Sequence, residues 1–298
     1  MAASGAREAM LAAASSVGFF TVVNHGIDAG LIEETFATAE SFFEGSPSEK
    51  SASSPYASKL NAGYEYMKQV RPSTGLPDVK ESIQVTTRES SMVGRWPSAA
   101  FESKVRAFVD AAHALARELL GMLGGDLNLP DAHTVWTENS QCTLRMLRYP
   151  PIAVDEAPPE GSMRAGAHTD WGCVTLLFQL PGNAGLECAS KNGSGWIKVD
   201  PTEGGVAVNV GDMLSRWTDG ALKSNLHRVR MPATPEEAAK SRYSIAWFAQ
   251  ADKHQPITVK DPLTGRVTYQ ATAGEYIQSR LQSNYGGGGR RTTEETAS

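Results

Sequence analysis

The stretch from Cys142 to Phe248 decides the fold class, because short apolar runs alternate there with turns. The clearest runs read Cys-Thr-Leu-Arg-Met-Leu-Arg-Tyr at 142–149, Val-Thr-Leu-Leu-Phe-Gln at 174–179 and Tyr-Ser-Ile-Ala-Trp-Phe at 243–248. Shorter runs of the same kind lie at 186–188, 196–199, 206–210 and 227–229. Many short strands at this spacing indicate an antiparallel sandwich or a jelly-roll barrel.

The residues before this stretch are mostly helical in pattern. Helices are predicted at Ala6–Val17, Leu31–Phe43 and Phe101–Leu123, and strands at Phe19–Val23 and Glu81–Thr87. Ser46, Pro47 and Glu49 form a capping-box pattern that starts a further short helix, and residues 51–78 are expected to be an ordered loop. We therefore predict a mainly β protein with N-terminal helices: a helical region at 1–134 whose strands join the core, a barrel core at 135–285 and a disordered tail at 286–298.

Composition excludes several classes of partner. The 298 residues include 28 Lys and Arg against 33 Asp and Glu, a net charge of −5, and no basic stripe that would bind nucleic acid. No apolar run approaches the length of a membrane span, and residues 1–16 lack the apolar core of a secretory signal. The three cysteines are too scattered for a disulfide framework. We expect a cytoplasmic, monomeric protein that binds no nucleic acid and no membrane.

Three side chains form a candidate metal site. His168 and Asp170 are two residues apart, so on extended backbone both point to the same face. His227, at the start of a strand-like run, is the best third ligand. Two histidines and one carboxylate are typical of the facial triad of non-haem Fe(II) oxygenases, although a zinc site or buried, hydrogen-bonded polar residues would use the same residue types. The other histidines (His25, His113, His133 and His254) are expected to be structural or exposed.

Arg242 and Ser244 form a candidate anion site. They lie two residues apart at the start of a β-rich run, so a guanidinium and a hydroxyl share one face. A planar guanidinium can bind a carboxylate through two parallel hydrogen bonds. A core-edge ion pair is the alternative role for Arg242.

With these motifs in place, the sequence resembles the isopenicillin-N-synthase-like branch of the Fe(II)/2-oxoglutarate-dependent dioxygenases. The resemblance implies a double-stranded β-helix with helices packed outside it. It implies Fe(II) bound by His168, Asp170 and His227, with Arg242, Ser244 and Tyr149 holding the distal carboxylate of 2-oxoglutarate. The segments that carry it span nearly the whole chain: Gly18–Gly26, Tyr149–Pro151, Gly166–Gly172, Val208–Asp212, Lys223–Val229, Arg242–Phe248 and Ala273–Tyr276.

The activity implied is oxidation of a C–H bond of a small organic molecule, by hydroxylation, desaturation or ring closure. 2-Oxoglutarate and O2 would be the cosubstrates, succinate and CO2 the co-products, and secondary-metabolite biosynthesis the setting. The rivals are an Fe(II) oxidase of the same fold that uses no 2-oxoglutarate, and an inactive binding protein.

The chain departs from the family pattern in two places. It reads Leu147-Arg148-Tyr149 where many plant members have Asn-x-Tyr, which makes this segment look more like microbial and fungal members. Met1 falls almost directly on the first helix, where members usually have a preceding strand.

The substrate side is predicted from strand alternation. If Tyr149 faces the cavity, Leu147 and Arg145 share its face, and Arg145 could bind an acidic or carbonyl-bearing substrate. Phe248 follows Arg242 and Ser244 on their face and matches a family position where an aromatic ring packs against substrate. A structural salt bridge for Arg145 and a purely core role for Phe248 are the alternatives.

Overall fold

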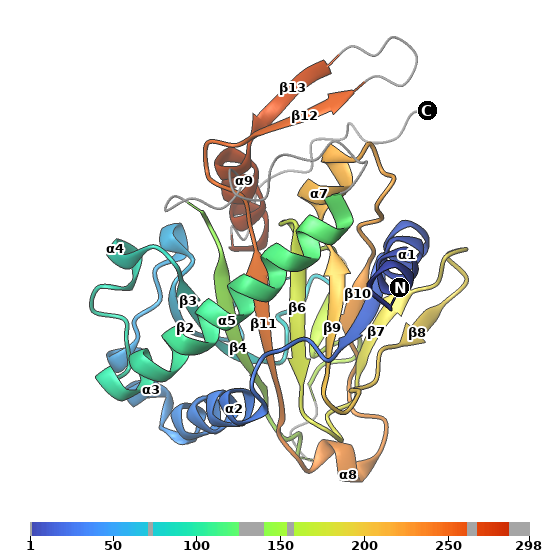
Figure 1. The fold of residues 1–298 in the computed structure, drawn as a ribbon. Coiled ribbons are helices and arrows are strands. Elements are labelled where there is room, and N and C mark those ends of the chain that lie inside the picture. The colour runs from blue at the N-terminus through green and yellow to red at the C-terminus, as the bar shows by residue number, and fades with distance from the viewer. Residues whose placement is uncertain (1, 71–73, 125–139, 154–157, 261–266, 286–298) are drawn as a thin grey trace.

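The computed structural model describes residues 2–70, 74–124, 140–153, 158–260 and 267–285 (Figure 1). One long helix crosses the sheet strands, and further helices lie at the edges of the molecule (Figure 1). The helices are α1 (Ala2–Ser16), α2 (Ala29–Glu44), α3 (Pro47–Ser53), α4 (Glu89–Met92), α5 (Ala99–Gly124), α7 (Asp212–Trp217), α8 (Pro235–Ala238) and α9 (Ala273–Tyr285), with one 3-10 turn, η1 (Ser58–Leu60).

Thirteen strands form the described sheets. They are β1 (Phe19–Val23), β2 (Gly63–Tyr66), β3 (Glu81–Thr86), β4 (Thr143–Tyr149), β5 (Ala165–His168), β6 (Val174–Gln179), β7 (Leu186–Ala189), β8 (Trp196–Lys198), β9 (Gly205–Val210), β10 (His227–Val229), β11 (Arg242–Ala249), β12 (Pro256–Lys260) and β13 (Val267–Thr272).

Two antiparallel sheets build the barrel. The larger has seven strands in the order β1-β9-β6-β11-β4-β3-β2, and the smaller has four in the order β5-β10-β7-β8. A separate hairpin, β12–β13, projects from the barrel beside α9 (Figure 1). Strands of the N-terminal region join the large sheet, because β1 pairs with β9 and β3 pairs with β4. The predicted jelly-roll fold with flanking helices is confirmed.

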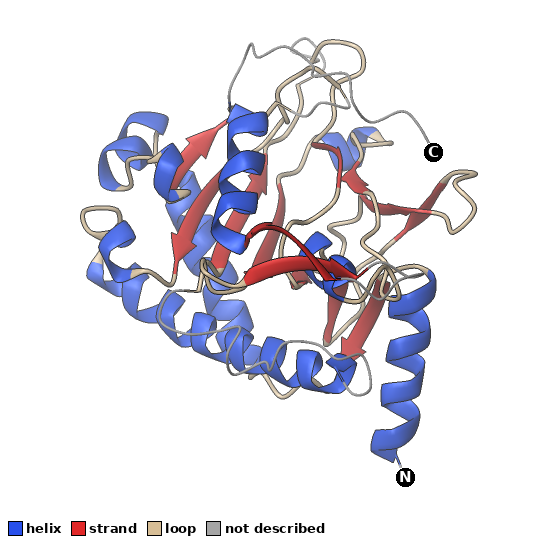
Figure 2. Cartoon of the chain, turned by 90° about the horizontal axis from the view of Figure 1, so that it is seen from above, coloured by secondary structure: helices blue, strands red, loops and turns tan. Residues whose placement is uncertain are grey.

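Helix α5 covers the outer face of the large sheet. Its apolar residues recur every three or four positions, which gives one stripe of buried side chains, including Val105, Phe108 and Ala112. Phe108 packs edge-on against Phe178 of β6, with ring centroids 4.9 Å apart. Burial of such an aromatic side chain stabilises the fold by roughly 1.5–3 kcal/mol. The view from above shows helices lining this side of the strands (Figure 2).

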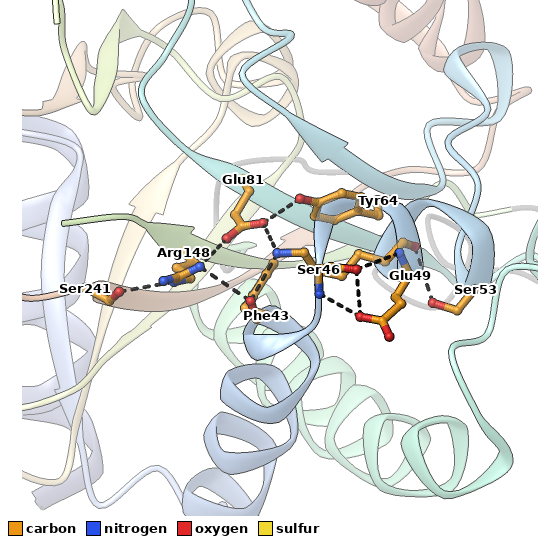
Figure 3. A network of polar contacts seen from close by, with 9 residues as sticks. Phe43, Ser46, Glu49, Ser53, Tyr64, Glu81, Arg148 and Ser241 are labelled. Carbon is orange, nitrogen blue, oxygen red and sulfur yellow. Dashed lines mark hydrogen bonds and ion pairs between the residues drawn. The ribbon is translucent and has the colours of Figure 1, made fainter. Parts of the chain in front are cut away.

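A polar cluster made of Lys50, Tyr64, Glu81 and Arg148 also lies outside the barrel, and we call it the outer-face cluster (Figure 3). Glu81 accepts hydrogen bonds from Lys50 Nζ at 2.7 Å, from Arg148 Nη1 at 2.8 Å and from the Tyr64 hydroxyl. Lys50 and Arg148 also donate to the carbonyl of Phe43 at the end of α2. The cluster therefore joins α2, α3, β2, β3 and β4 through one buried carboxylate.

Most predicted elements are present, and the differences are local. The expected loop at 51–78 contains η1 and strand β2, which pairs with β3. Strands β5, β12 and β13 and helix α9 had no prediction. The capping box is confirmed, since Ser46 and Glu49 cap α3 reciprocally. His133, the region boundary at 134/135 and the tail at 286–298 lie outside the described residues. None of the described helices has the length and hydropathy needed to span a bilayer.

Candidate functional site

The sheet pairing brings the three predicted metal-site side chains together. His168 ends β5 and faces His227, the first residue of the paired strand β10, while Asp170 follows in the turn after β5. The Nε2 atoms of His168 and His227 lie 3.8 Å and 3.5 Å from Asp170 Oδ1. Possible ligand atoms of all three residues lie within 4.8 Å of one another. One metal ion could therefore contact two imidazoles and a carboxylate on one face.

Each histidine of the triad is oriented by a hydrogen bond from its other ring nitrogen. Nδ1 of His168 lies 2.7 Å from the carbonyl of Gly166, and Nδ1 of His227 lies 3.2 Å from the carbonyl of Asn225. Since a carbonyl only accepts, each Nδ1 carries the proton and donates it, so the lone pair that a metal would bind lies on each Nε2.

Asp170 is held in the same way through its other oxygen. Its Oδ2 accepts hydrogen bonds from Thr175 Oγ1 at 2.6 Å and from Asn209 Nδ2 at 2.7 Å, so Oδ1 is left for the ion. Burial opposes ionisation of Asp170, but the positive charge that His227 and His168 carry when protonated, together with the hydrogen bond from the Thr175 hydroxyl, more than offsets it. The pKa of Asp170 therefore lies well below its usual range, as a metal-binding carboxylate requires.

Asp212 at the start of α7 joins the two ligand-bearing segments. Its backbone N–H donates to the carbonyl of Asp170 at 2.7 Å. Its carboxylate accepts from Thr169, between the first two ligands, and from Ser224, three residues before His227. The Tyr276 hydroxyl of α9 donates to the same carboxylate at 2.7 Å. Asp212 thus connects both ligand segments with the C-terminal helix.

Arg242, Ser244 and Tyr149, the residues predicted to form an anion site, lie side by side in the structure. Arg242 is 3% exposed, its guanidinium lies 4.8 Å above the Tyr149 ring, and Ser244 accepts from its Nη1 at 3.4 Å. Its Nε donates to the carbonyls of Asn183 and Ala184, and its Nη2 donates to Gln179 at 2.8 Å. No carboxylate of the described residues lies within 4.0 Å of it, and burial lowers its pKa. The predicted alternative of an ion pair for Arg242 is not supported within the described part of the chain.

One cavity of about 550 Å³ contains all nine residues predicted for the site. The metal triad and Arg242 line it together with Arg145, Leu147, Tyr149, Ser244 and Phe248. Alternation along β4 and β11 explains this, because residues 145, 147 and 149 of β4 pair with 246, 244 and 242 of β11 on the inward face.

Arg145 lies at the other end of the cavity from Arg242, beside two amide side chains. It donates to Gln84 at 2.7 Å and to Gln69 at 3.4 Å, and its guanidinium lies 5.6 Å from the Phe248 ring centroid. Lys80, another lining residue, pairs with Asp78 at 2.7 Å.

Sequence reasoning missed the residues that orient the ligands. Asn209 and Asp212 lie within a quoted motif but received no role, and Thr175 and Lys80 were not singled out. The available signal was a polar residue at an inward-facing position of an apolar strand, as Asn209 is in β9 and Thr175 is in β6. Their partners come from other strands, so their roles depend on the register between strands.

These residues fit an Fe(II) ion and a dicarboxylate cosubstrate. The donor set is two imidazoles and one carboxylate, and the buried guanidinium of Arg242 still has at least one N–H beyond its protein partners. A jelly-roll barrel with such a triad inside defines a class, the non-haem Fe(II) oxygenases.

Comparison with known proteins identifies the family. Residues 140–251 match the model of the 2OG-Fe(II) oxygenase superfamily, and residues 3–99 match the model described as non-haem dioxygenase in morphine synthesis N-terminal. The chain belongs to the 2OG-Fe(II) oxygenase superfamily, and its cofactor and cosubstrate are Fe(II) and 2-oxoglutarate.

Two fungal relatives and one solved structure illustrate the similarity. The 2-oxoglutarate-dependent dioxygenase caaD of Aspergillus niger is 31% identical over 90% of this chain and 84% of its own. The dioxygenase tropC of Talaromyces stipitatus is 31% identical over 94% and 89%. A full-length protein of Neurospora crassa, crystallised with alpha-KG (2-oxoglutarate) and thymine, is 27% identical, with a TM-score of 0.80 over 93% of this chain and 90% of that one. The protein is therefore a 2-oxoglutarate-dependent dioxygenase.

Proposed function

We propose that this dioxygenase oxidises a C–H bond of a small organic molecule of secondary metabolism, and that Arg242, Ser244 and Tyr149 bind the distal carboxylate of 2-oxoglutarate. The observation that carries the proposal is the buried Arg242, which has no carboxylate partner among the described residues and lines the same cavity as the triad. A buried cation is costly unless an anion compensates it, and a bound carboxylate would do so. The fungal dioxygenase relatives and the morphine-synthesis family model support the metabolic setting.

The protein side chains act by binding and orientation. His168, Asp170 and His227 would hold the iron on one face, which leaves its other positions toward the cavity. Bound iron and 2-oxoglutarate supply the oxidation: O2 and 2-oxoglutarate give succinate and CO2 as the C–H bond is oxidised. Arg242 fixes the far end of the cosubstrate, since its guanidinium is itself held by Gln179 and two carbonyls. The buried apolar walls exclude water and include Leu186, Val229 and Ala246.

Arg145, Leu147 and Phe248 are proposed to contact the substrate. They line the cavity beside the triad, and the Arg145 guanidinium packs against the Phe248 ring. Arg145 already donates to two glutamine side chains. Its planar face is then the part best placed to pack against a substrate.

Succinate formation by purified protein tests the proposal. The enzyme, loaded with Fe(II), is supplied with 2-oxoglutarate, O2 and candidate small molecules, and succinate and the oxidised product are measured together. We expect matched amounts of the two, and no turnover by His227→Ala because it lacks one of three ligands. Substrate oxidation without succinate would instead identify an oxidase that uses no 2-oxoglutarate. Full activity of His227→Ala would overturn the ligand assignment.

A further inference from the structure

A second hollow, of about 420 Å³, adjoins the cavity at the triad. It shares Arg145, His168, Asp170 and Phe248 with the cavity. Its other lining residues are Asn61, Thr169, Trp171 and Gln250. The hollow therefore starts at the metal site and continues past the proposed substrate residues.

Two buried amides line this hollow with their oxygens unpaired. Asn61 is 8% exposed and Gln250 is 5% exposed, and the side-chain oxygens Asn61 Oδ1 and Gln250 Oε1 have no hydrogen-bond partner among the described residues. Buried polar groups are almost always paired in folded proteins, because an unmade hydrogen bond costs free energy. Two such amides in one hollow therefore point to a ligand that supplies the missing hydrogen bonds.

The backbone aims both residues into the hollow. Gln250 comes two residues after Phe248 and so continues the inward face of β11, the face of Arg242 and Ser244. Asn61 ends η1 in the left-handed conformation, with φ 50° and ψ 48°. Asn adopts this conformation more readily than other non-glycine residues, and it ends the 3-10 turn here.

The remaining walls suit a flat and uncharged ligand. The guanidinium of Arg145 lies 5.6 Å from the Phe248 ring, and the Trp171 side chain adds a second aromatic surface. Flat rings pack well against aromatic and guanidinium planes. Because Arg145 donates to Gln84 and Gln69, part of its hydrogen-bonding edge is already occupied.

We infer that this hollow is the substrate subsite, and that it takes a flat molecule with a neutral amide edge, such as a lactam or an imide. The two unpaired atoms are both acceptors, so Asn61 and Gln250 complement the N–H groups that such a ligand carries. This inference rests on the proposed function, since it places the substrate beside the metal triad.

Binding of small lactams to the loaded protein tests the inference. Protein with Mn(II) and 2-oxoglutarate, kept anaerobic, is titrated calorimetrically with thymine and with 2-pyridone. We expect both to bind, and 1,3-dimethyluracil, whose N–H groups are methylated, to bind at least about tenfold more weakly. This comparison needs no variant, so it does not depend on how a substitution folds.

Two substitutions then test the individual amides. Gln250→Met keeps the side-chain volume but removes the amide, and Asn61→Gly removes the amide and tolerates the positive φ. Each is expected to weaken thymine binding by about tenfold. Gln141→Met is the matched control: Gln141 is also buried with an unpartnered amide nitrogen among the described residues, but it lines neither hollow. It should leave the affinity for thymine unchanged.

Several results would overturn the inference. These are benzoate binding more tightly than both lactams, equal binding of 1,3-dimethyluracil and thymine, unchanged affinity in both variants, or no binding of either lactam. A separate anaerobic titration with 2-oxoglutarate tests the proposed cosubstrate site independently of the substrate subsite. If 2-oxoglutarate binds and the lactams do not, only the subsite is wrong. If 2-oxoglutarate fails to bind, the proposed cosubstrate site is wrong, and the lactam titration of Mn(II)-loaded protein still decides the subsite.

Discussion

Arg148 and Arg242 lie on paired strands at neighbouring register positions, yet their surroundings are opposite. Arg242 pairs with Tyr149 across β11 and β4, and Arg148 pairs with Tyr243 one position along, so the two side chains point to opposite faces of one sheet. Arg148 meets the carboxylate of Glu81, which also binds Lys50 and Tyr64 (Figure 3). Arg242 meets carbonyls, an amide and a hydroxyl, and no carboxylate among the described residues.

The difference separates Arg148, whose charge is paired within the fold, from Arg242, whose charge is proposed to bind the cosubstrate. In the outer-face cluster both cations meet a carboxylate of the protein itself, and loss of that carboxylate should destabilise the fold without affecting binding. Arg242 is left uncompensated inside a cavity, and its loss should weaken binding with little effect on stability. The four predictions below test this contrast.

Glu81→Leu should have the largest effect, on stability. It leaves the 4% exposed Lys50 ammonium buried without its anion, and breaking a buried ion pair from one side costs about 3–5 kcal/mol. Chemical denaturation would measure the loss in free energy of unfolding. The double variant Lys50→Met with Glu81→Leu should recover much of it, because no uncompensated ammonium then remains. Equal stability of the two variants would show that the ion pair is not the cause.

Arg242→Met should have the second-largest effect, a loss of affinity for 2-oxoglutarate. Losing charge-assisted hydrogen bonds worth about 1.5–3 kcal/mol would raise the Kd for 2-oxoglutarate by roughly 10- to 150-fold. The melting temperature should change little, because removal of a buried cation offsets the loss of its hydrogen bonds to two carbonyls, Gln179 and Ser244. Arg148→Met is the matched control on the other face: it should lower the melting temperature and leave the Kd unchanged. The reverse pattern would invalidate the comparison.

Asn209→Ala should weaken metal binding. It removes one of the two donors that hold Asp170 Oδ2, and losing such an outer contact lowers metal affinity by roughly 10- to 100-fold. Competition between Fe(II), or Co(II) as a spectroscopic substitute, and a chelator would measure this. Thr38→Ala, on the exposed side of α2, is a suitable control because its hydroxyl bonds within its own helix. Unchanged metal affinity in Asn209→Ala would remove Asn209 from the set of positioning residues.

Glu237→Gln should have the smallest effect, because this carboxylate pairs with Arg230 near the surface. Hydrogen bonds from Arg230 and from the Ala233 N–H lower the pKa of Glu237 to about 2 from its usual 4.5. Because the pKa of Glu237 is lower in the folded than in the unfolded protein, its ionised form stabilises the fold at pH values above 4.5. This contribution is therefore present at pH 7 and is lost as the pH falls from 4.5 toward 2. Because solvent screens this partly exposed pair, we expect Glu237→Gln to lower the free energy of unfolding by less than about 1 kcal/mol at pH 7. Denaturation at pH 7 and pH 3 should show the variant's deficit shrinking with acidification.

Much of the site could be predicted from local pattern. The alternation of β4 and β11 placed Arg145, Leu147 and Tyr149 on one face and Arg242, Ser244 and Phe248 on another, and all six line one cavity. This works because the side-chain period of a strand is a local property of the chain. The same rule extends to Gln250, which the sequence reasoning did not pursue.

What could not be predicted depends on which strands are neighbours. Asn209 and Thr175 meet Asp170 only because β9 and β6 pair in the register that sets Thr175 opposite Asn209. Asp212 reaches Tyr276 across a large separation in the chain. Loop residue Asn61 lines the hollow from the end of a 3-10 turn, a position that no periodicity in the sequence signals.

The sequence by itself indicated the class of fold, the metal triad and the arginine proposed as the cosubstrate anchor, because these follow from residue type, from spacing along single strands and from the family resemblance. Only the tertiary structure decided which buried charges are balanced. Arg148 and Arg242 are both strand arginines in apolar surroundings, and the sequence does not show which of them meets a carboxylate. Their roles differ because packing of α2, α3 and β3 brings Glu81 to one face of the sheet, while the cavity face brings no carboxylate of the described residues to the other.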